Sequence, residues 1–263
     1  MVIFANHAHV FPKSLRPDGS LEELQRLMET CQIDRAVAFA PFADQVQELR
    51  LEPNQWLAEE LTRYPNILGF GTIDLAKPDP AKQAEAIAAL GFKGIKLHPA
   101  YQKFNLVAEE LENFYAAAEE LGLFICIHMG VHWHRLKDYH PLLCDELAYF
   151  YPKLRFTIEH VGGLSFFNDA LAVLANNLAT GNVYAGITSV LNKNRHHLWY
   201  LGQERMELLA ALIGSKQMVF GLDFPYNGIA EVQETIEAIR GLDISDEDKA
   251  LIFGGNLQRI LEE

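Results

Sequence analysis

Cysteine is scarce in this chain, and long apolar runs are missing. Cys31, Cys126 and Cys144 are its 3 cysteines, and an odd number of distant thiols does not suit a disulfide framework. No apolar run approaches the ~20 residues that a membrane span needs. The amino terminus has no basic region ahead of its first apolar stretch, which argues against a signal peptide. These absences predict a cytoplasmic protein with reduced thiols and no membrane segment.

Positive charge is also in short supply. The chain has 22 Lys and Arg against 35 Asp and Glu, which gives a formal net charge of −13. Such an excess repels polyphosphate, and no run of basic residues offsets it locally. We therefore expect a small-molecule substrate rather than nucleic acid. The sequence leaves the oligomeric state open, a homo-oligomer included.

Short β-like runs alternate with longer segments of helical periodicity, which is the pattern of βα units in a parallel sheet. The first helix should begin after Ser20, which forms a capping box with Glu23, and the third after Asp79. Strands are expected at residues 2–9, 36–40, 67–73, 93–98, 123–128, 155–160, 182–188 and 217–223. Later helices are expected at residues 108–121, 141–151, 170–178, 198–213, 229–240, 245–253 and 256–262.

This alternation predicts a single (β/α)8 TIM barrel, forming one domain over residues 1–263. The length lies near the roughly 250 residues that are typical of such barrels. An open nucleotide-binding sheet is disfavoured because the first β-to-α turn lacks a glycine-rich phosphate loop. Catalytic groups of TIM barrels lie at the carboxyl ends of the strands. The side chains at those ends are therefore the first candidates for chemistry.

Two histidines, His7 and His9, end the first expected strand. Residues two apart on an extended strand share one face, so both imidazoles should stand side by side. Three later strands also end in a residue that can bind a metal, namely His128, His160 and Asp223. A carboxylate ending an apolar strand is costly without a cationic partner, and a metal ion would supply one. Each residue also has a plainer interpretation as a core histidine or a turn cap, but their convergence predicts a metal site at the barrel mouth.

Lys96 and His98 share a face at the end of the fourth expected strand. A buried lysine beside metal ions can be carboxylated to bridge two of them, can pair with a substrate carboxylate, or can form an interior salt bridge. His160 could likewise bind a second ion or hydrogen-bond the reacting group. His98 stands just before Pro99, where it could mark a turn.

Two loops after strands carry the aromatic, imidazole and cationic side chains that suit substrate contact. The first follows the fifth expected strand and contains His132, His134 and Arg135. The second follows the seventh and contains Arg195. With His98, these four residues are the candidates for substrate contact, and none is predicted to be a metal ligand.

Taken in order, these segments resemble the amidohydrolase-2 group of the metal-dependent amidohydrolase superfamily. That group includes aminocarboxymuconate semialdehyde decarboxylase and related lactonases. The resemblance spans essentially the whole chain, and the order and spacing of its motifs are more specific than any one of them. The motifs are His7-Ala8-His9 and the segments 91–99, 127–128, 159–163, 220–225 and 255–261.

The resemblance implies that His7, His9, His128 and Asp223 hold one divalent ion, with zinc expected and manganese or a similar ion as the alternative. It also implies that His160 is the catalytic histidine beside the activated water. We assign Asp223 as general base and then general acid.

Two positions depart from the pattern of the group. Ala5 stands where an Asp is often found, and the segment 186–189, Gly-Ile-Thr-Ser, stands where Asp-x-Ser is often found. The first departure bears on strand packing, and the second on how the substrate is recognised.

The expected function is hydrolysis of a small-molecule amide, lactone or related carbonyl bond by a metal-activated water. A non-hydrolytic carboxy-lyase could use the same metal site and is the main alternative. A nuclease of the TatD type and an inactive metal-binding scaffold are the two others. The acidic net charge disfavours the nuclease, and the retained set of candidate groups disfavours the scaffold.

Overall fold

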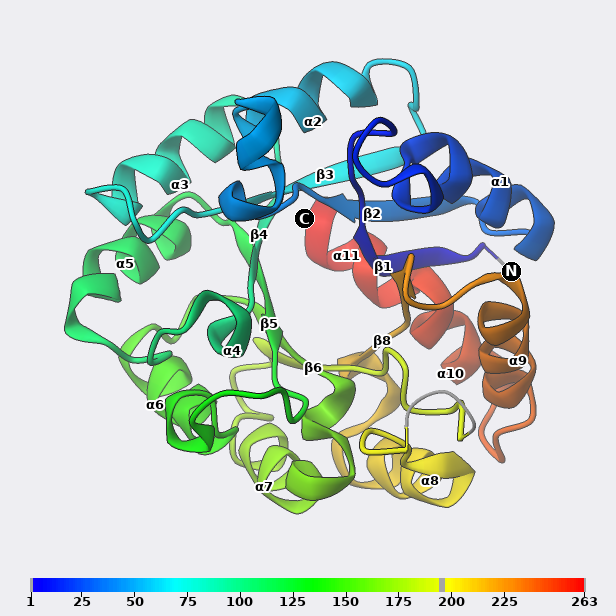
Figure 1. Ribbon diagram of the computed structural model, residues 1–263. Coiled ribbons are helices and arrows are strands. Elements are labelled where there is room, and N and C mark those ends of the chain that lie inside the picture. The colour runs from blue at the N-terminus through cyan, green and yellow to red at the C-terminus, as the bar shows by residue number, and fades with distance from the viewer. Residues whose placement is uncertain (1, 194–196, 263) are drawn as a thin grey trace.

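The computed structural model describes residues 2–193 and 197–262. Its nine parallel strands form one sheet in the order β8-β7-β6-β5-β4-β3-β2-β1-β9. The strands are β1 (Phe4–His9), β2 (Arg35–Phe39), β3 (Ile67–Thr72), β4 (Gly94–Leu97), β5 (Phe124–His128), β6 (Phe156–Glu159), β7 (Val183–Gly186), β8 (Met218–Val219) and β9 (Gly221–Phe224). Figure 1 looks into the resulting barrel, with its helices arranged around the outside.

β8 and β9 are the two parts of the expected eighth strand, which Phe220 interrupts. β8 pairs with β7 and β9 pairs with β1. At the interruption the amide of Asn6 donates to the carbonyl of Phe220 at 2.9 Å. The two parts together join the ends of the sheet, so the predicted TIM barrel is confirmed.

The helices follow the strands in the expected alternation. The α-helices are α1 (Leu21–Cys31), α2 (Pro53–Leu61), α3 (Pro80–Ala89), α4 (Pro99–Gln102), α5 (Glu112–Glu120), α6 (Leu142–Phe150), α7 (Gly163–Asn176), α8 (Gly202–Ile213), α9 (Ile229–Arg240), α10 (Asp246–Ala250) and α11 (Asn256–Glu262). The 3-10 turns are η1 (Pro17–Gly19), η2 (Ala43–Leu49), η3 (Glu109–Leu111), η4 (Leu136–Asp138), η5 (His160–Gly162) and η6 (Ser215–Gln217), and a π-type turn η7 (Leu251–Gly255) joins α10 to α11. In the described ranges, no helix has the length and apolar character needed to cross a membrane.

The predicted caps form as expected, whereas two helix starts are wrong. The side chain of Ser20 accepts from the amide of Glu23, and that of Asp79 accepts from the amide of Lys82. α7 begins at Gly163 instead of residue 170, because left-handed backbone at Gly162 turns the chain directly from β6 into the helix. α8 begins at Gly202 instead of residue 198.

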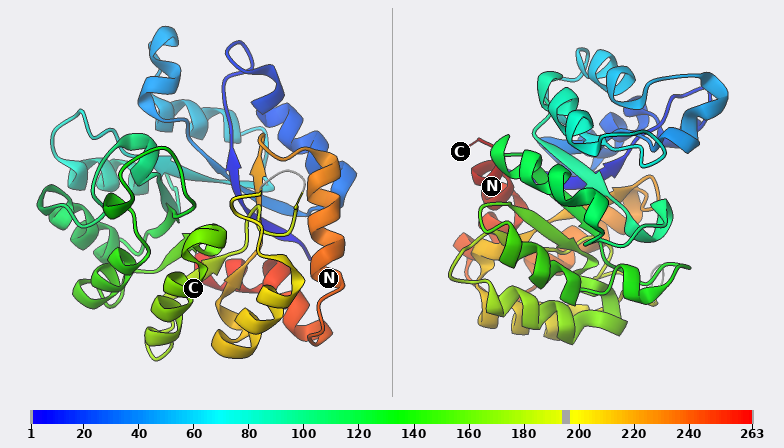
Figure 2. Two further views of the ribbon diagram at one scale, coloured as in Figure 1. Left: turned by 60° about the horizontal axis from the view of Figure 1, so that its bottom comes forward. Right: turned by 90° about the vertical axis from the view of Figure 1, so that its left-hand side faces the viewer.

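Aromatic rings fill the barrel interior below its mouth. Phe39, Phe70, Phe124 and Tyr184 follow one another from strand to strand, with ring centroids 5.8, 6.1 and 5.9 Å apart. α11 closes the opposite end of the barrel, where both termini also lie (Figure 2). Its buried contribution is Leu257, Ile260 and Leu261. The candidate site residues therefore lie at the carboxyl ends of the strands, above a layer of aromatic rings.

Candidate active site

The imidazoles of His7 and His9 meet at the mouth of the barrel, with ring centroids 5.1 Å apart. The prediction that they stand together is therefore right, although the backbone is not regular strand. His7 has a φ of 67°, and the register of β1 with β2 shifts between Ala5 and Ala8. Left-handed backbone at a non-glycine residue is strained and persists only where its surroundings hold it.

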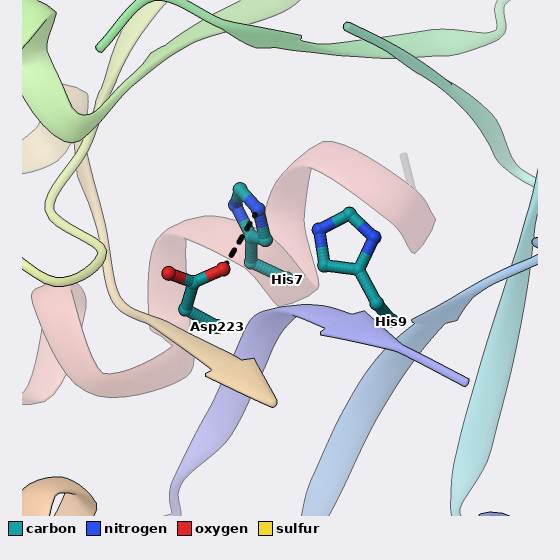
Figure 3. A group of neighbouring side chains, drawn as sticks. All are labelled: His7, His9 and Asp223. Carbon is teal, nitrogen blue, oxygen red and sulfur yellow. Dashed lines mark ion pairs between the residues drawn. The ribbon is translucent and has the colours of Figure 1, made fainter. Parts of the chain in front are cut away.

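Asp223 reaches the same point from β9 (Figure 3). Its Oδ1 lies 3.6 Å from Nε2 of His7, and one ligand atom each from His7, His9 and Asp223 lies within 4.8 Å of the others. Nitrogen and oxygen ligands of one small ion lie at most about 4.4 Å apart, since each is roughly 2.0–2.2 Å from the metal. The three groups therefore have nearly the spacing of a metal site.

Two side chains that the sequence did not single out as site residues hold Asp223 in place. Ser189 donates its hydroxyl to Oδ2 of Asp223 at 2.7 Å, and Asn227 donates to the Ser189 oxygen at 3.0 Å. Asn227 also donates to the carbonyl of Leu222 at 2.8 Å. Ser189 belongs to the segment that departs from the family pattern, so that segment still supplies a partner for the acid.

His128 and His160 form a second pair, with Nδ1 of His128 3.1 Å from Nε2 of His160. Each ring's other nitrogen meets a carbonyl: Nε2 of His128 lies 2.9 Å from the oxygen of Gly130, and Nδ1 of His160 lies 2.8 Å from that of Thr188. A carbonyl oxygen only accepts, so both of these nitrogens carry a proton. In neutral rings the two facing nitrogens are then both bare, and their lone pairs oppose each other.

Both rings of this pair are neutral near pH 7. Burial lowers the pKa of His160 to about 4, against an opposing contribution from Asp223. Burial and the nearby His98 hold the pKa of His128 well below its usual range. Burial beside His7 and Lys96 lowers the pKa of His9 in the same way. Neutral imidazoles with inward lone pairs are metal ligands, and a cation would relieve the contact between His128 and His160.

The imidazole and carboxylate donors fit a divalent metal ion. Within the described residues, His7, His9 and Asp223 lie close enough together to bind one metal ion, and His128 is outside this group of three. His160 also lies next to His7, with ring centroids 5.3 Å apart. The structure thus brings all five predicted residues to one mouth and groups three of them closely.

Lys96 and Glu159 lie beneath His7 and are completely buried. Nζ of Lys96 is 3.2 Å from Nε2 of His7, and Oε2 of Glu159 is 2.8 Å from Nδ1 of the same ring. Burial alone would raise the pKa of Glu159, but the neighbouring His7, Lys96 and His160 outweigh it and lower the pKa, so the carboxylate is ionised. Sequence reasoning placed Lys96 here and did not assign Glu159 any role.

The site opens into a cavity of about 380 Å³ above His7, His9 and Asp223. His98 and His132 contribute to its wall, whereas His134 and Arg135 contact Asp138 at 3.3 and 3.5 Å. Arg195 lies outside the described residues. The lining residues are His7, His9, Phe42, Gln45, His98, Tyr101, His128, His132, His160, Trp199, Asp223 and Tyr226.

Stacked rings shape this cavity. The ring of His98 stacks on His128 at 3.8 Å, and Trp199 stacks on His160 at 4.3 Å. His98 also caps α4, because its Nδ1 accepts from the amide of Tyr101 at 3.2 Å. It therefore marks a turn, as its place before Pro99 indicated, and lines the cavity as well.

The fold and the mouth together define a TIM-barrel protein with a metal-type site, and comparison with known proteins identifies its family. The sequence pattern of the amidohydrolase family, Amidohydro_2, matches residues 7–262. The chain belongs to this family. It is thus an enzyme of the amidohydrolase-2 group, as the sequence predicted.

Solved structures of similar fold cover almost the whole chain. An uncharacterized TIM-barrel protein from Bordetella bronchiseptica has a TM-score of 0.79 and 18% identity, covering 100% of this chain and 99% of that one. The 5-carboxyvanillate decarboxylase of Sphingomonas paucimobilis has a TM-score of 0.73 and 16% identity, with 99% of each chain covered. A candidate 2-pyrone-4,6-dicarboxylic acid hydrolase of Pseudomonas putida also has a TM-score of 0.73 and 16% identity, covering 99% and 97%. At these identities the likeness establishes the fold.

Proposed function

We propose that this enzyme is a metal-dependent hydrolase that cleaves an amide, lactone or related carbonyl bond of a small molecule. The observation that carries the proposal is the convergence of His7, His9 and Asp223 within 4.8 Å at the floor of the cavity. These three residues and His128 would hold one divalent ion, with zinc the first choice and manganese the alternative. Such an ion lowers the pKa of a bound water molecule to roughly 7 and polarises a carbonyl.

Asp223 accepts the proton of the attacking water and returns it to the leaving group. The hydroxyl of Ser189, 2.7 Å from Oδ2, keeps the carboxylate aimed at the floor of the cavity. Nε2 of His160, which is bare in the neutral ring, accepts a hydrogen bond from the attacking water and orients it. Trp199 stacks on His160 and covers one face of its ring.

A substrate screen with metal-loaded protein tests this proposal. Lactones, amides and carboxylic acids are offered, acid release is followed for hydrolysis, and the doubly substituted His7→Ala/His9→Ala protein is the control. Hydrolysis by the wild type that the control lacks would support the proposal. Turnover that persists in the control would overturn the metal-dependent reading.

A carboxy-lyase is the second candidate, and the flat rings around the cavity favour it. Phe42 and Tyr101 stack at 5.2 Å on one wall, and Trp199 and His160 at 4.3 Å form another pair. Such walls suit planar aromatic or unsaturated carboxylates. In this reaction His160 or Asp223 would protonate the carbon that loses CO₂. Release of CO₂ without hydrolysis of any lactone or amide would select this alternative.

The proposed site holds one ion, with Lys96 as a free ammonium. A second group of potential ligands, His7, Cys126 and Glu159, lies below the first. The carboxylate oxygens in that group already accept hydrogen bonds, which leaves little reason for a second ion. Intact-mass analysis of native protein checks the lysine: an added CO₂ that is lost in Lys96→Met would show a carbamate and overturn the single-ion proposal.

We further propose that the enzyme works in the cytoplasm on small molecules, without nucleic acid. Cys31, Cys126 and Cys144 are all buried and unbridged, as reducing conditions would keep them. Fluorescence microscopy of the tagged protein and a nuclease assay test these two points. A homo-oligomer stays a prediction for measurement by light scattering.

A further inference from the structure

Glu159 has no part in the proposed chemistry, yet hydrogen bonds hold both of its carboxylate oxygens in place below the site. We propose that Glu159 is a positioning residue: it holds the proton of His7 on Nδ1, so that the lone pair of Nε2 is available to the ion that His7, His9 and Asp223 would share. This inference deepens the proposed function and rests on it for the identity of the ligand set. Glu159 itself would touch neither the ion nor the substrate.

Four donors and one ring nitrogen of His7 converge on the two carboxylate oxygens of Glu159. Oε2 faces Nδ1 of His7 at 2.8 Å and accepts from the hydroxyl of Thr188 at 2.9 Å. Oε1 accepts from three groups on the other side. These are the hydroxyl of Thr157 at 2.7 Å, the thiol of Cys126 at 3.1 Å and the amide of Asn6 at 3.2 Å. A carboxylate held at both oxygens cannot turn away from His7, so its direction is fixed by β1, β5, β6 and the segment after β7.

The hydrogen bonds of His7 then decide which of its nitrogens is bare. Both oxygens of Glu159 already accept from four other donors, so the carboxylate also accepts in its 2.8 Å contact with His7, and Nδ1 of His7 is the protonated nitrogen. Nε2 is approached by Nζ of Lys96, which as an ammonium only donates, at 3.2 Å. Glu159 and Lys96 therefore select the same tautomer, and Oδ1 of Asp223, 3.6 Å from Nε2, is too distant to accept a hydrogen bond from it. A carboxylate that accepts a hydrogen bond from the other nitrogen of a metal-binding histidine raises the basicity of that histidine and fixes the orientation of its ring.

The neighbouring strand leaves space for this carboxylate at a glycine. Glu159 pairs with Gly186 of β7 in the sheet. A Cβ atom at residue 186 would lie 2.5 Å from the carboxylate carbon of Glu159 and 2.5 Å from its Oε2. The absence of a side chain at Gly186 therefore creates the space in which the carboxylate sits. A methyl group there would displace Glu159 and leave its charge unchanged.

The nearest rival explanation is a second metal site made of His7, Cys126 and Glu159. Burial is the main reason that the pKa of the Cys126 thiol lies well above its usual range, and the negative charge of Glu159 raises it further. The buried Nζ of Lys96 also lies 3.9 Å from the sulfur, close to where a second ion would have to sit. Metal stoichiometry separates the two: a second ion per chain that Glu159→Gln removes would select the rival.

The first test measures the tautomer directly in metal-free wild-type protein. Long-range proton–nitrogen NMR spectra of the histidine rings, assigned with His7→Gln, report which nitrogen of His7 is protonated. We expect the proton on Nδ1 in the wild type and a mixture of tautomers in Glu159→Gln. A proton on Nε2 in the wild type would overturn the inference, whatever the variants do.

The second test measures metal affinity by chelator competition with zinc, and by the cobalt absorption spectrum. Glu159→Gln and Gly186→Ala should each bind the ion about 10–100-fold more weakly than the wild type. Thr157→Val is the matched control, since it removes a donor to Oε1 and leaves the bond to His7; its affinity should stay within about threefold. Circular dichroism confirms that each variant is folded.

The outcomes separate this inference from the proposed function. If wild-type protein binds no ion, the proposed function is wrong, but the tautomer of His7 is still decided by the NMR measurement. Wild-type protein that binds an ion, with a folded Glu159→Gln of equal affinity, would sink the inference alone. If Glu159→Gln does not fold, the wild-type tautomer and the affinity of Gly186→Ala still decide the question.

Discussion

The imidazoles on β1 and those at the ends of β5 and β6 are anchored in different ways. His7 meets an ionised carboxylate at 2.8 Å, whereas His128 and His160 meet main-chain carbonyls at 2.9 and 2.8 Å. A carboxylate makes a stronger, charge-assisted hydrogen bond and increases the basicity of the ring. The first arrangement suits a permanent metal ligand. The second leaves His128 and His160 less basic than His7, and one of them can take part in the reaction without binding the ion.

This difference predicts its largest effect in metal content. The protein should carry about one ion per chain, as expected for a mononuclear site, and His7→Ala combined with His9→Ala should reduce it to none. His160→Ala should retain the ion, because His160 is proposed to orient the attacking water and not to bind the ion. Elemental analysis after gel filtration measures both. Unchanged occupancy in the double variant would break the metal assignment, and loss of the ion in His160→Ala would exchange the roles of His128 and His160.

The next effect concerns turnover with the ion still present. Asp223→Asn keeps an oxygen that can ligate but cannot accept a proton from water, so kcat should fall about 10²–10⁴-fold while metal content stays near the wild-type value. Ser189→Ala should cost less, because it removes only the hydroxyl that orients Oδ2. If Asp223→Asn keeps a near-normal kcat at full occupancy, another group takes the proton, with His160 the first to examine.

The positions of these residues were predictable from the sequence because apolar runs mark the strands, and all barrel strands deliver their last residues to one mouth. The local backbone was not predictable. His160 was assigned to a strand at 155–160, where alternation would turn its neighbour Glu159 away from His160. In the structure β6 ends at Glu159, which faces inward with Thr157, and left-handed backbone at His160 brings that ring inward as well.

The same limit explains other differences between sequence and structure. The left-handed backbone at His7 shifts the register of β1. The alternation of apolar residues does not reveal this shift, because it carries no signal for a bulge at a histidine. Ser189 and Asn227 support Asp223 from two different segments, and only the closed barrel brings them together. By contrast, helices with local signals were found correctly, as the caps at Ser20 and Asp79 show.

Acid should destabilise the metal-free protein through its buried neutral histidines. The ordinary pKa of histidine is 6.5, and that of His160 in the fold is about 4. Between these values the unfolded chain binds more protons than the folded one, so the stabilising contribution is complete above pH 6.5 and is lost as the pH falls toward 4. For His160 alone the full loss is about 3 kcal/mol. Lowered pKa values of His9, His98 and His128 act in the same direction.

Thermal unfolding of chelator-treated protein at pH 7.5, 6 and 5 measures this effect. We expect Tm to decrease steadily over this range, and the decrease to be smaller in His160→Asn, which lacks one of the titrating rings. Equal Tm values at pH 7.5 and pH 5 would show that the rings are not neutral in the fold, and would weaken the argument that their lone pairs await a cation.

The smallest expected effect compares two histidines of one loop. His132 lines the cavity and makes edge contact with His98 at 4.9 Å, whereas His134 faces Asp138 at 3.3 Å. His132→Ala should therefore raise KM several-fold, by about 1 kcal/mol of lost contact, with little change in kcat. His134→Ala is the matched control and should change neither constant by more than about twofold, since His134 contacts Asp138 and is not among the residues that line the cavity. Equal effects of the two substitutions would mean that the loop acts as a unit, through its packing, and that the cavity wall seen here does not set substrate affinity.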